Sequence, residues 1–281
     1  MRRLIFVFRT AAKRFSADGC AFLAQAIAFN ALFAIFPLSL LAIAVLAFVY
    51  GTDEGQRSAI ALFATVAPGI QDTLTENLHQ VIGLRGLSGV IGLVVLAWSG
   101  KNLFMALAYA LDRALGFEQG RPFISGVLVS LVMLPVVGVL LIVATAVPVL
   151  ITVAVQFGSF PHSALVSQIA GYASGFLLVF AISALLYAYL PSRNVGIAFG
   201  VPGALFTAIA WEAAQIGFAV YTTHVSFFHV YGALATFAIL LLWFYYMGII
   251  FLYGAQLSAQ WYAQRGPESQ SEPDREHLRT A

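Results

Sequence analysis

Long runs without a charged side chain dominate the pattern of apolar and polar positions along this chain. No Asp, Glu, Lys or Arg occurs in residues 19–52, 122–192, 194–211 or 213–264. A helix needs about 20 predominantly apolar residues to cross a hydrocarbon core about 30 Å thick. Runs of this length therefore predict several membrane-spanning helices.

Turn-forming residues around positions 157–162 and 190–194 divide the longest runs, because Pro, Gly and Ser at these places favour chain reversal. The pattern then predicts six spans, at residues 21–50, 88–110, 123–156, 164–190, 195–221 and 231–256. The predicted fold is all-α, a polytopic bundle of six transmembrane helices. An even number of crossings leaves both termini on the same side.

The basic residues indicate which side that is, because Lys and Arg concentrate in short cytoplasmic loops. All of them except Arg57, Arg85 and Lys101 fall on the side of the two termini. We therefore expect both termini in the cytoplasm. A cleaved signal peptide is the alternative for the N-terminus, but the apolar run continues to Tyr50, well beyond the apolar part of such a peptide.

The predicted membrane domain, residues 21–260, is flanked by two short cytoplasmic segments. In residues 1–20, Leu4, Phe8 and Phe15 recur at near-helical spacing among basic residues, which predicts an amphipathic helix on anionic lipid. Basic residues that only set the topology are the alternative. Residues 261–281 are rich in Pro, Ser, Glu and Arg, and they predict a disordered tail.

The longest loop between two predicted spans, residues 51–87, lies on the external side in this topology. Ile70, Leu74, Leu78 and Ile82 recur within it at helical spacing. This spacing predicts a surface helix packed against the periplasmic ends of the bundle. Such a helix either caps a cavity or only shields the bundle.

Composition agrees with a membrane protein and excludes other classes. Of the 281 residues 61% are hydrophobic and only 9% are charged, and mean hydropathy is +0.90. An ordinary soluble domain has about 25% charged residues, so this chain cannot cover a water-exposed surface, and a cytosolic enzyme is excluded. The formal charge of +2 does not indicate a nucleic-acid partner.

The residues that commonly hold metals are too few and too scattered to predict a cofactor. Cys20 is the single cysteine, which rules out an internal disulfide or a cysteine metal cluster. His79, His162, His224 and His229 lie on or near the external side, but in separate loops without close ligand spacing. We expect solvated histidines and no bound metal or cofactor.

Two ionisable residues inside predicted spans are the first candidates for function, since charge is costly in a bilayer. Glu212 lies in the external half of the fifth span, with Gln215 on nearly the same helical face, and Lys101 lies at or below the middle of the second. Each has a structural alternative. Lys101 would reach cytoplasmic headgroups, and a protonated Glu212 would bond to a neighbouring helix.

Prolines within the spans predict bent helices, because proline frees a backbone carbonyl. Pro37 follows the polar residues Gln25 and Asn30 in the first span, and Pro135 and Pro148 interrupt the third. These kinks and polar groups predict a polar-lined cleft. Kinks that serve only helix packing are the alternative.

Several short stretches, in their order and spacing, resemble the YihY/virulence factor BrkB family of bacterial inner-membrane proteins. They include AFNALFAIFP at 28–37, ALDR at 110–113, LPSRNV at 190–195, YGAL at 231–234 and YGAQL at 253–257. The resemblance covers roughly residues 21–260. It implies glutamate where this chain has Gln256, and it does not include Lys101. A role for either residue would be particular to this chain.

The resemblance implies a six-helix protein of the bacterial inner membrane, without a settled activity. Members have been linked to serum resistance and to transport, including of lipids. The family has also carried a ribonuclease label. Metal-dependent hydrolysis of RNA needs several convergent carboxylates or a histidine pair beside a basic groove, whereas Asp112 is the sole acid near its end of the second span. We therefore do not expect an enzyme.

The function that we expect is transport of a lipid or small amphiphile through a cleft between bent helices. Glu212 would be the internal polar contact, and Arg193 and Arg113 would hold an anionic headgroup at the cytoplasmic rim. Membrane lipids are the expected partners. The sequence contains no phosphate-binding loop for ATP. A scaffold that binds lipids or envelope proteins without transport is the alternative.

Overall fold

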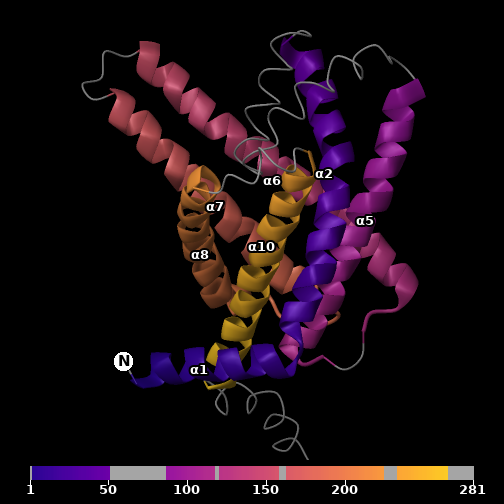
Figure 1. The fold of residues 1–281 in the computed structure, drawn as a ribbon, viewed down its shortest axis with the longest axis vertical. Coiled ribbons are helices and arrows are strands. Elements are labelled where there is room, and N and C mark those ends of the chain that lie inside the picture. The colour runs from indigo at the N-terminus through magenta and orange to yellow at the C-terminus, as the bar shows by residue number, and fades with distance from the viewer. Residues whose placement is uncertain (1, 51–86, 118–119, 158–162, 225–232, 265–281) are drawn as a thin grey trace, which may run out of the picture.

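The structure, a computed structural model, describes residues 2–50, 87–117, 120–157, 163–224 and 233–264. These residues form seven helices and no strand (Figure 1). The helices are α1 (Arg2–Ala17), α2 (Cys20–Tyr50), α5 (Leu87–Leu115), α6 (Phe123–Phe157), α7 (Ser163–Tyr189), α8 (Ile197–His224) and α10 (Ala233–Ala263).

Six of these helices contain 27 or more residues, and each coincides with one predicted span. The all-helical, polytopic class is thereby confirmed. Within the described residues four segments are long and apolar enough to cross a membrane, and a fifth counts if α1 and the start of α2, bent by 71°, form one broken span. The four are Val94–Leu115, Phe123–Val143, Ile197–Tyr221 and Phe237–Ala263. The count of six crossings stays a prediction.

Two predicted features fall outside the described residues. One is the surface helix predicted in the loop 51–87, and the other is the disordered tail predicted at residues 261–281. The first residues of that tail are described, and α10 continues into them as far as Ala263. The helix predicted within residues 1–20 is present as α1.

Helix α1 lies across one end of the bundle, which we call the α1 end (Figure 1). Gly19, with a φ of 66°, supplies the left-handed residue that breaks the chain between α1 and α2. Val7 and Ala11 are buried and pack with Leu257 of α10. The hydroxyl of Tyr253 donates to the Phe8 carbonyl at 3.0 Å, so α1 is fastened to α10.

Helix α10 is central to the bundle, because it packs against α1, α2, α5 and α8 (Figure 1). Its backbone comes closest to that of α8 where Gly254 meets Gly203. A Cβ on Gly203 would collide with the Gly254 carbonyl oxygen, and one on Gly254 would lie 2.8 Å from the Gly203 carbonyl oxygen. Small residues permit this approach, which is a common way to pack helices in a membrane.

Tyr187 of α7 joins the same crossing from a third helix. The side chain is fully buried, and its hydroxyl donates to the Phe251 carbonyl of α10 at 2.6 Å. Because that donates the single phenolic hydrogen, the Thr207 hydroxyl of α8 must be the donor in its 2.8 Å bond to Tyr187. One tyrosine therefore links α7, α8 and α10.

We predict that Gly203→Ala lowers the stability of the protein by about 1–3 kcal/mol, since the added methyl group forces two packed backbones apart. Thermal unfolding of the purified protein can be followed with a thiol-reactive fluorophore, because the single cysteine, Cys20, is fully buried. The melting temperature should fall by several degrees.

Gly217→Ala is the matched control, since it makes the same change in the same helix α8, where nothing lies within 4 Å of the new Cβ. Its melting temperature should stay the same or rise, because alanine favours a helix over glycine by about 1 kcal/mol. A Gly203→Ala protein that unfolds at the same temperature as Gly217→Ala would show that the crossing is not tightly packed.

Candidate functional site: a groove between two helices

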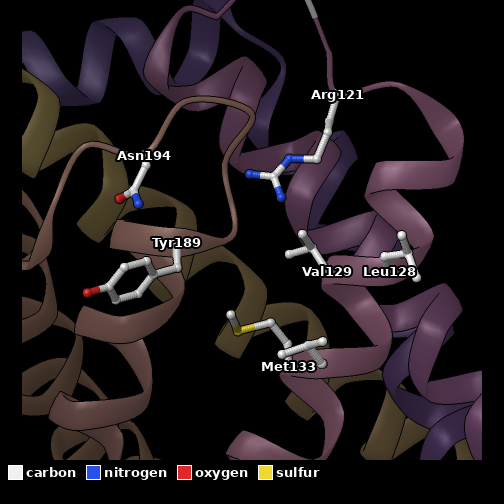
Figure 2. Close-up of a pocket in the computed structure, with 7 residues that line it drawn as sticks. Arg121, Leu128, Val129, Met133, Tyr189 and Asn194 are labelled. Atoms are coloured by element: carbon white, nitrogen blue, oxygen red, sulfur yellow. The ribbon is translucent and has the colours of Figure 1, made fainter.

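A cavity of about 330 Å³ lies at the α1 end between the start of α6 and the end of α7 (Figure 2). Its walls combine apolar side chains with a few polar ones: Arg121, Leu128, Val129, Val132, Met133, Tyr189 and Asn194. Figure 2 shows the side chains of Arg121 and Met133 extending into the space that faces Tyr189 and Asn194.

A second cavity of about 360 Å³ continues farther along the same two helices. Its walls are entirely apolar: Pro135, Val136, Val139, Leu140 and Leu185. The lining positions on α6 recur every three or four residues and so share one face of the helix. We call the two cavities together the α6–α7 groove. The lining surface is almost entirely apolar throughout, and the end bordered by Arg121 and Asn194, at the α1 end, is called the mouth.

The α6–α7 groove opens sideways. Three of its lining residues on α6, Leu128, Val132 and Val139, are 60%, 57% and 58% exposed. In a bilayer such apolar side chains would face hydrocarbon, since they lie on a helix apolar enough to span it. A molecule in the groove would therefore exchange with the surrounding lipid.

Two loop segments are tied together around the mouth of the groove. The carboxylate of Asp112, at the end of α5, accepts a 2.7 Å bond from the Ser192 backbone N–H and a second bond from its hydroxyl. A guanidinium N–H of Arg121 donates to the Pro191 carbonyl at 2.7 Å. These contacts hold the chain between α7 and α8 against the chain between α5 and α6.

The end of α5 has the geometry that presents Asp112 to this loop. Gly116 has a φ of 78°, the Phe117 N–H donates to the Asp112 carbonyl at 2.8 Å, and the Gly116 N–H donates to the Arg113 carbonyl at 3.2 Å. This pair of bonds is a Schellman motif, which satisfies the last carbonyls of a helix. Asp112 therefore lies in the last turn of a helix whose end is capped, and its side chain is only 7% exposed.

Glu212 lies on α8 where that helix faces α7. The side chain is half-buried, and a Cβ placed on Gly175 of α7 would lie 3.5 Å from Glu212 Oε1. Among the residues that the structure describes, the carboxylate has no hydrogen-bond or ion-pair partner. Gln215, one turn along the same helix, is also half-buried. The bond to a neighbouring helix considered from the sequence is not seen here.

Lys101 lies beside an aromatic ring of its own helix. Its Nζ is 4.6 Å from the centre of the Trp98 ring, and Trp98 is 66% exposed. Long side chains lean toward the N-terminal end of their helix, which explains the contact. The ammonium therefore points away from the α1 end. The sequence had suggested the opposite direction, toward cytoplasmic headgroups. Lys101 and Glu212 do not form an ion pair with each other.

The polar residues expected beside Pro37 do not gather into a cleft with it. Asn30 donates from its amide to the Ala26 carbonyl of the same helix at 2.8 Å, and Gln25 is exposed. Helix α2 continues through the buried Pro37, and α6 continues through Pro135 and Pro148. Of these prolines, Pro135 lines the groove.

The two arginines predicted at the rim lie near the mouth but outside the set of residues that line it. Arg193 is exposed, with its guanidinium 5.9 Å from the centre of the Phe117 ring, and Arg113 is exposed at the end of α5. Arg121 lines the cavity instead. The structure therefore brings a different arginine to the candidate site.

Sequence reasoning overlooked Arg121 and Asn194 as candidate binding residues. Arg121 counted only as a topology signal, and Asn194 only as part of a turn. A signal was available, because the predicted topology puts the loops before the third and fifth spans on the same side of the membrane. Their polar residues can meet there, although the order of the spans does not say which loops are neighbours.

Gln256 stands where the family resemblance implies a glutamate, and it is fully buried. Its amide nitrogen donates to the Asp18 carboxylate at 2.7 Å and so ties α10 to the break between α1 and α2. An ionised glutamate could not donate this bond and would bring two like charges together. The amide thus suits its neighbour in this chain.

Within the described part of the chain, no three His, Cys, Asp or Glu side chains gather closely enough to hold a metal ion. Of the four external histidines considered from the sequence, His224 ends α8 and the other three lie outside the described residues.

The long apolar helices define the class of this protein, a polytopic helical membrane protein. Residues 11–279 match the family described as Virulence factor BrkB. The chain belongs to this family, which confirms the resemblance seen in its short motifs.

Curated relatives carry membrane-protein names and, in one case, an enzyme-like name. A UPF0761 membrane protein of Pseudoalteromonas translucida is 30% identical over 243 residues, 83% of this chain and 78% of the relative. YfkH of Bacillus subtilis, whose name describes it as ribonuclease-like, is 26% identical over 83% of this chain and 86% of its own. A UPF0761 membrane protein of Methylibium petroleiphilum is 28% identical, and this chain spans 61% of it. No solved structure matches the chain.

We predict that Asp112→Ala destabilises the protein by about 1–3 kcal/mol, because it leaves the Ser192 N–H and hydroxyl without their acceptor. Ser192→Ala should cost less, since the backbone bond remains. Thermal unfolding of both single variants and the double variant gives the coupling, expected at about 0.5–3 kcal/mol.

Arg113→Gln is the control for this pair, because it changes the neighbouring exposed side chain and should leave the melting temperature unchanged. Strictly additive effects of the two substitutions would contradict the contact between Asp112 and Ser192.

Proposed function

We propose that this protein is a transporter of flippase type for a lipid or small amphiphile in the bacterial inner membrane. The α6–α7 groove is the observation that carries the proposal. It combines polar side chains that border its mouth at one end of the bundle with apolar walls that open sideways. An amphiphile has the same two parts, one that prefers water and one that prefers hydrocarbon.

The α1 end is cytoplasmic in this proposal, and both termini lie there. Support comes from the exposed basic residues at that end, which include Arg9, Lys13, Arg14, Arg113 and Arg193. Such residues concentrate on the cytoplasmic side. The exposed face of α1 also carries Ile5 and Phe6, as expected for a helix that lies on anionic lipid.

In this proposal Glu212 is the internal polar contact, and it lies between α8 and α7, outside the residues that line the groove. Support comes from its half-buried position in a span and from the lack of a partner among the described residues, since a carboxyl group in a membrane span is costly to retain without a use. It faces α7, the helix that also forms one wall of the groove. Small movements of α7 would therefore affect both places.

The proposal assigns no catalytic reaction to the chain, although one relative has a ribonuclease-like name. Asp112 is the acid in the family motif ALDR and lies close to the groove mouth. Both of its carboxylate oxygens already accept bonds from Ser192. That engagement supports a structural role for Asp112. A scaffold without transport remains the rival function.

A flux assay separates the transporter from the scaffold. The purified full chain, reconstituted into liposomes with a fluorescent phospholipid, should speed movement of the label between leaflets, measured by chemical quenching of the outer leaflet. Val139→Trp should slow this movement several-fold, because the indole fills the apolar part of the groove. Val94→Trp is the matched control, since it makes the same substitution at an exposed position of α5 that lines neither cavity.

Liposomes in which the wild-type chain moves no labelled lipid would overturn the transport proposal and favour the scaffold. Equal flux in the two tryptophan variants would show that the lipid does not pass through the groove.

We predict that Glu212→Ala also slows the flux several-fold, because it deletes the internal polar contact. Glu212→Gln keeps the shape and the hydrogen-bonding capacity, so it should retain more flux than Glu212→Ala if the carboxyl group acts as a hydrogen-bonding partner. The same liposome assay measures both variants. Wild-type flux in both would show that Glu212 takes no part.

A further inference from the structure

We infer that the α6–α7 groove is a binding site for a phospholipid with an anionic headgroup, held by Arg121 at its phosphate and by the apolar walls at one acyl chain. This inference deepens the proposed function, since the bound lipid would be the cargo. It stands on the charge of the mouth, the donors left free there, and the length and opening of the apolar part.

The charge at the mouth fits an anion. Arg121 is the one charged residue among the seven that line the first cavity, and no acid lines it. One of its N–H groups is held at 2.7 Å by the Pro191 carbonyl, which fixes the guanidinium near the cavity. A guanidinium has five N–H donors, so others remain for two phosphate oxygens at once.

A second donor stands on the opposite wall (Figure 2). The Oδ1 atom of Asn194 accepts a 3.3 Å bond from the Gly196 N–H, which orients the amide. Its NH₂ group is then the free part of this exposed side chain, and it can donate to a headgroup or ester oxygen. Arg121 and Asn194 therefore lie on opposite walls of the same mouth, in two different loops.

The apolar part fits an acyl chain in one leaflet. Lining residues on α6 extend from Leu128 to Leu140, a distance of about 18 Å along the axis at 1.5 Å per residue. Half of a hydrocarbon core is about 15 Å thick. A free phosphate ion would leave these walls exposed, and a water-soluble partner could not reach them from the side. A membrane lipid satisfies both parts.

Native mass spectrometry of the delipidated full chain in detergent tests the site. The probes are phosphatidylglycerol, which is anionic, and phosphatidylcholine with identical acyl chains, which is zwitterionic. Phosphatidylglycerol should bind more tightly to the wild type. Arg121→Gln should weaken its binding by about tenfold or more, as expected for lost charge-assisted hydrogen bonds. Arg121→Lys should retain part of the affinity, because it keeps the charge without the planar fork.

Arg14→Gln is the matched control. It removes one exposed positive charge from the same end of the bundle, and phosphatidylglycerol binding should stay within about twofold, since exposed charges are screened. Val139→Trp should weaken both lipids. Equal affinity for the two lipids in the wild type, unchanged binding in Arg121→Gln, or an equal loss in Arg14→Gln would each overturn the site.

The binding site and the transport proposal can be overturned independently of each other. Tight, Arg121-dependent binding without lipid movement in liposomes would keep the site and overturn the transport proposal. Lipid movement with unchanged binding in Arg121→Gln would keep transport and overturn the site.

Discussion

The backbone contact between α8 and α10 at Gly203 and Gly254 is the constraint on which the rest of the bundle depends. Helix α10 also packs against α1, α2 and α5, whereas α8 packs against α7, so this crossing joins two groups of helices. Between helices in a membrane there is no water to drive association, and close van der Waals packing takes that role. Tyr187 adds directional bonds at the same place, because its buried hydroxyl bonds both to the Thr207 hydroxyl and to the Phe251 carbonyl.

The two sides of α7 differ in how completely they are packed. Toward α8 the helices come so close that a Cβ on Gly200 would lie 2.9 Å from the Ala184 carbonyl oxygen. Toward α6 the two cavities of the groove remain. The bonds of Asp112 and Arg121 to the loop after α7 hold the mouth while the apolar walls stay uncovered. A site that accepts lipid needs this combination of a fixed polar end and an open apolar side.

The helices themselves could be predicted from the sequence, because a charge-free run longer than 20 residues leaves few alternatives to a spanning helix. Glu212 and Lys101 were identifiable for the same reason, as ionisable groups inside such runs. Their surroundings were not, because periodicity does not show which helix a side chain faces. Lys101 lies over Trp98 of its own helix, and Glu212 faces Gly175, which is distant in sequence. The family could be recognised, because its short motifs survive in order.

The sequence by itself determined the class of protein, the positions of the long helices and the concentration of positive charge on one side, since these depend on local composition and on the thickness of a bilayer. Only the tertiary structure decided which arginine lines a cavity. Arg113, Arg121 and Arg193 are equivalent by charge and by predicted side, but α6 and α7 pack so that Arg121 alone of the three lines the groove. That choice depends on contacts between residues 70 and 80 positions apart, Arg121 with Pro191 and Asp112 with Ser192, which no local pattern encodes.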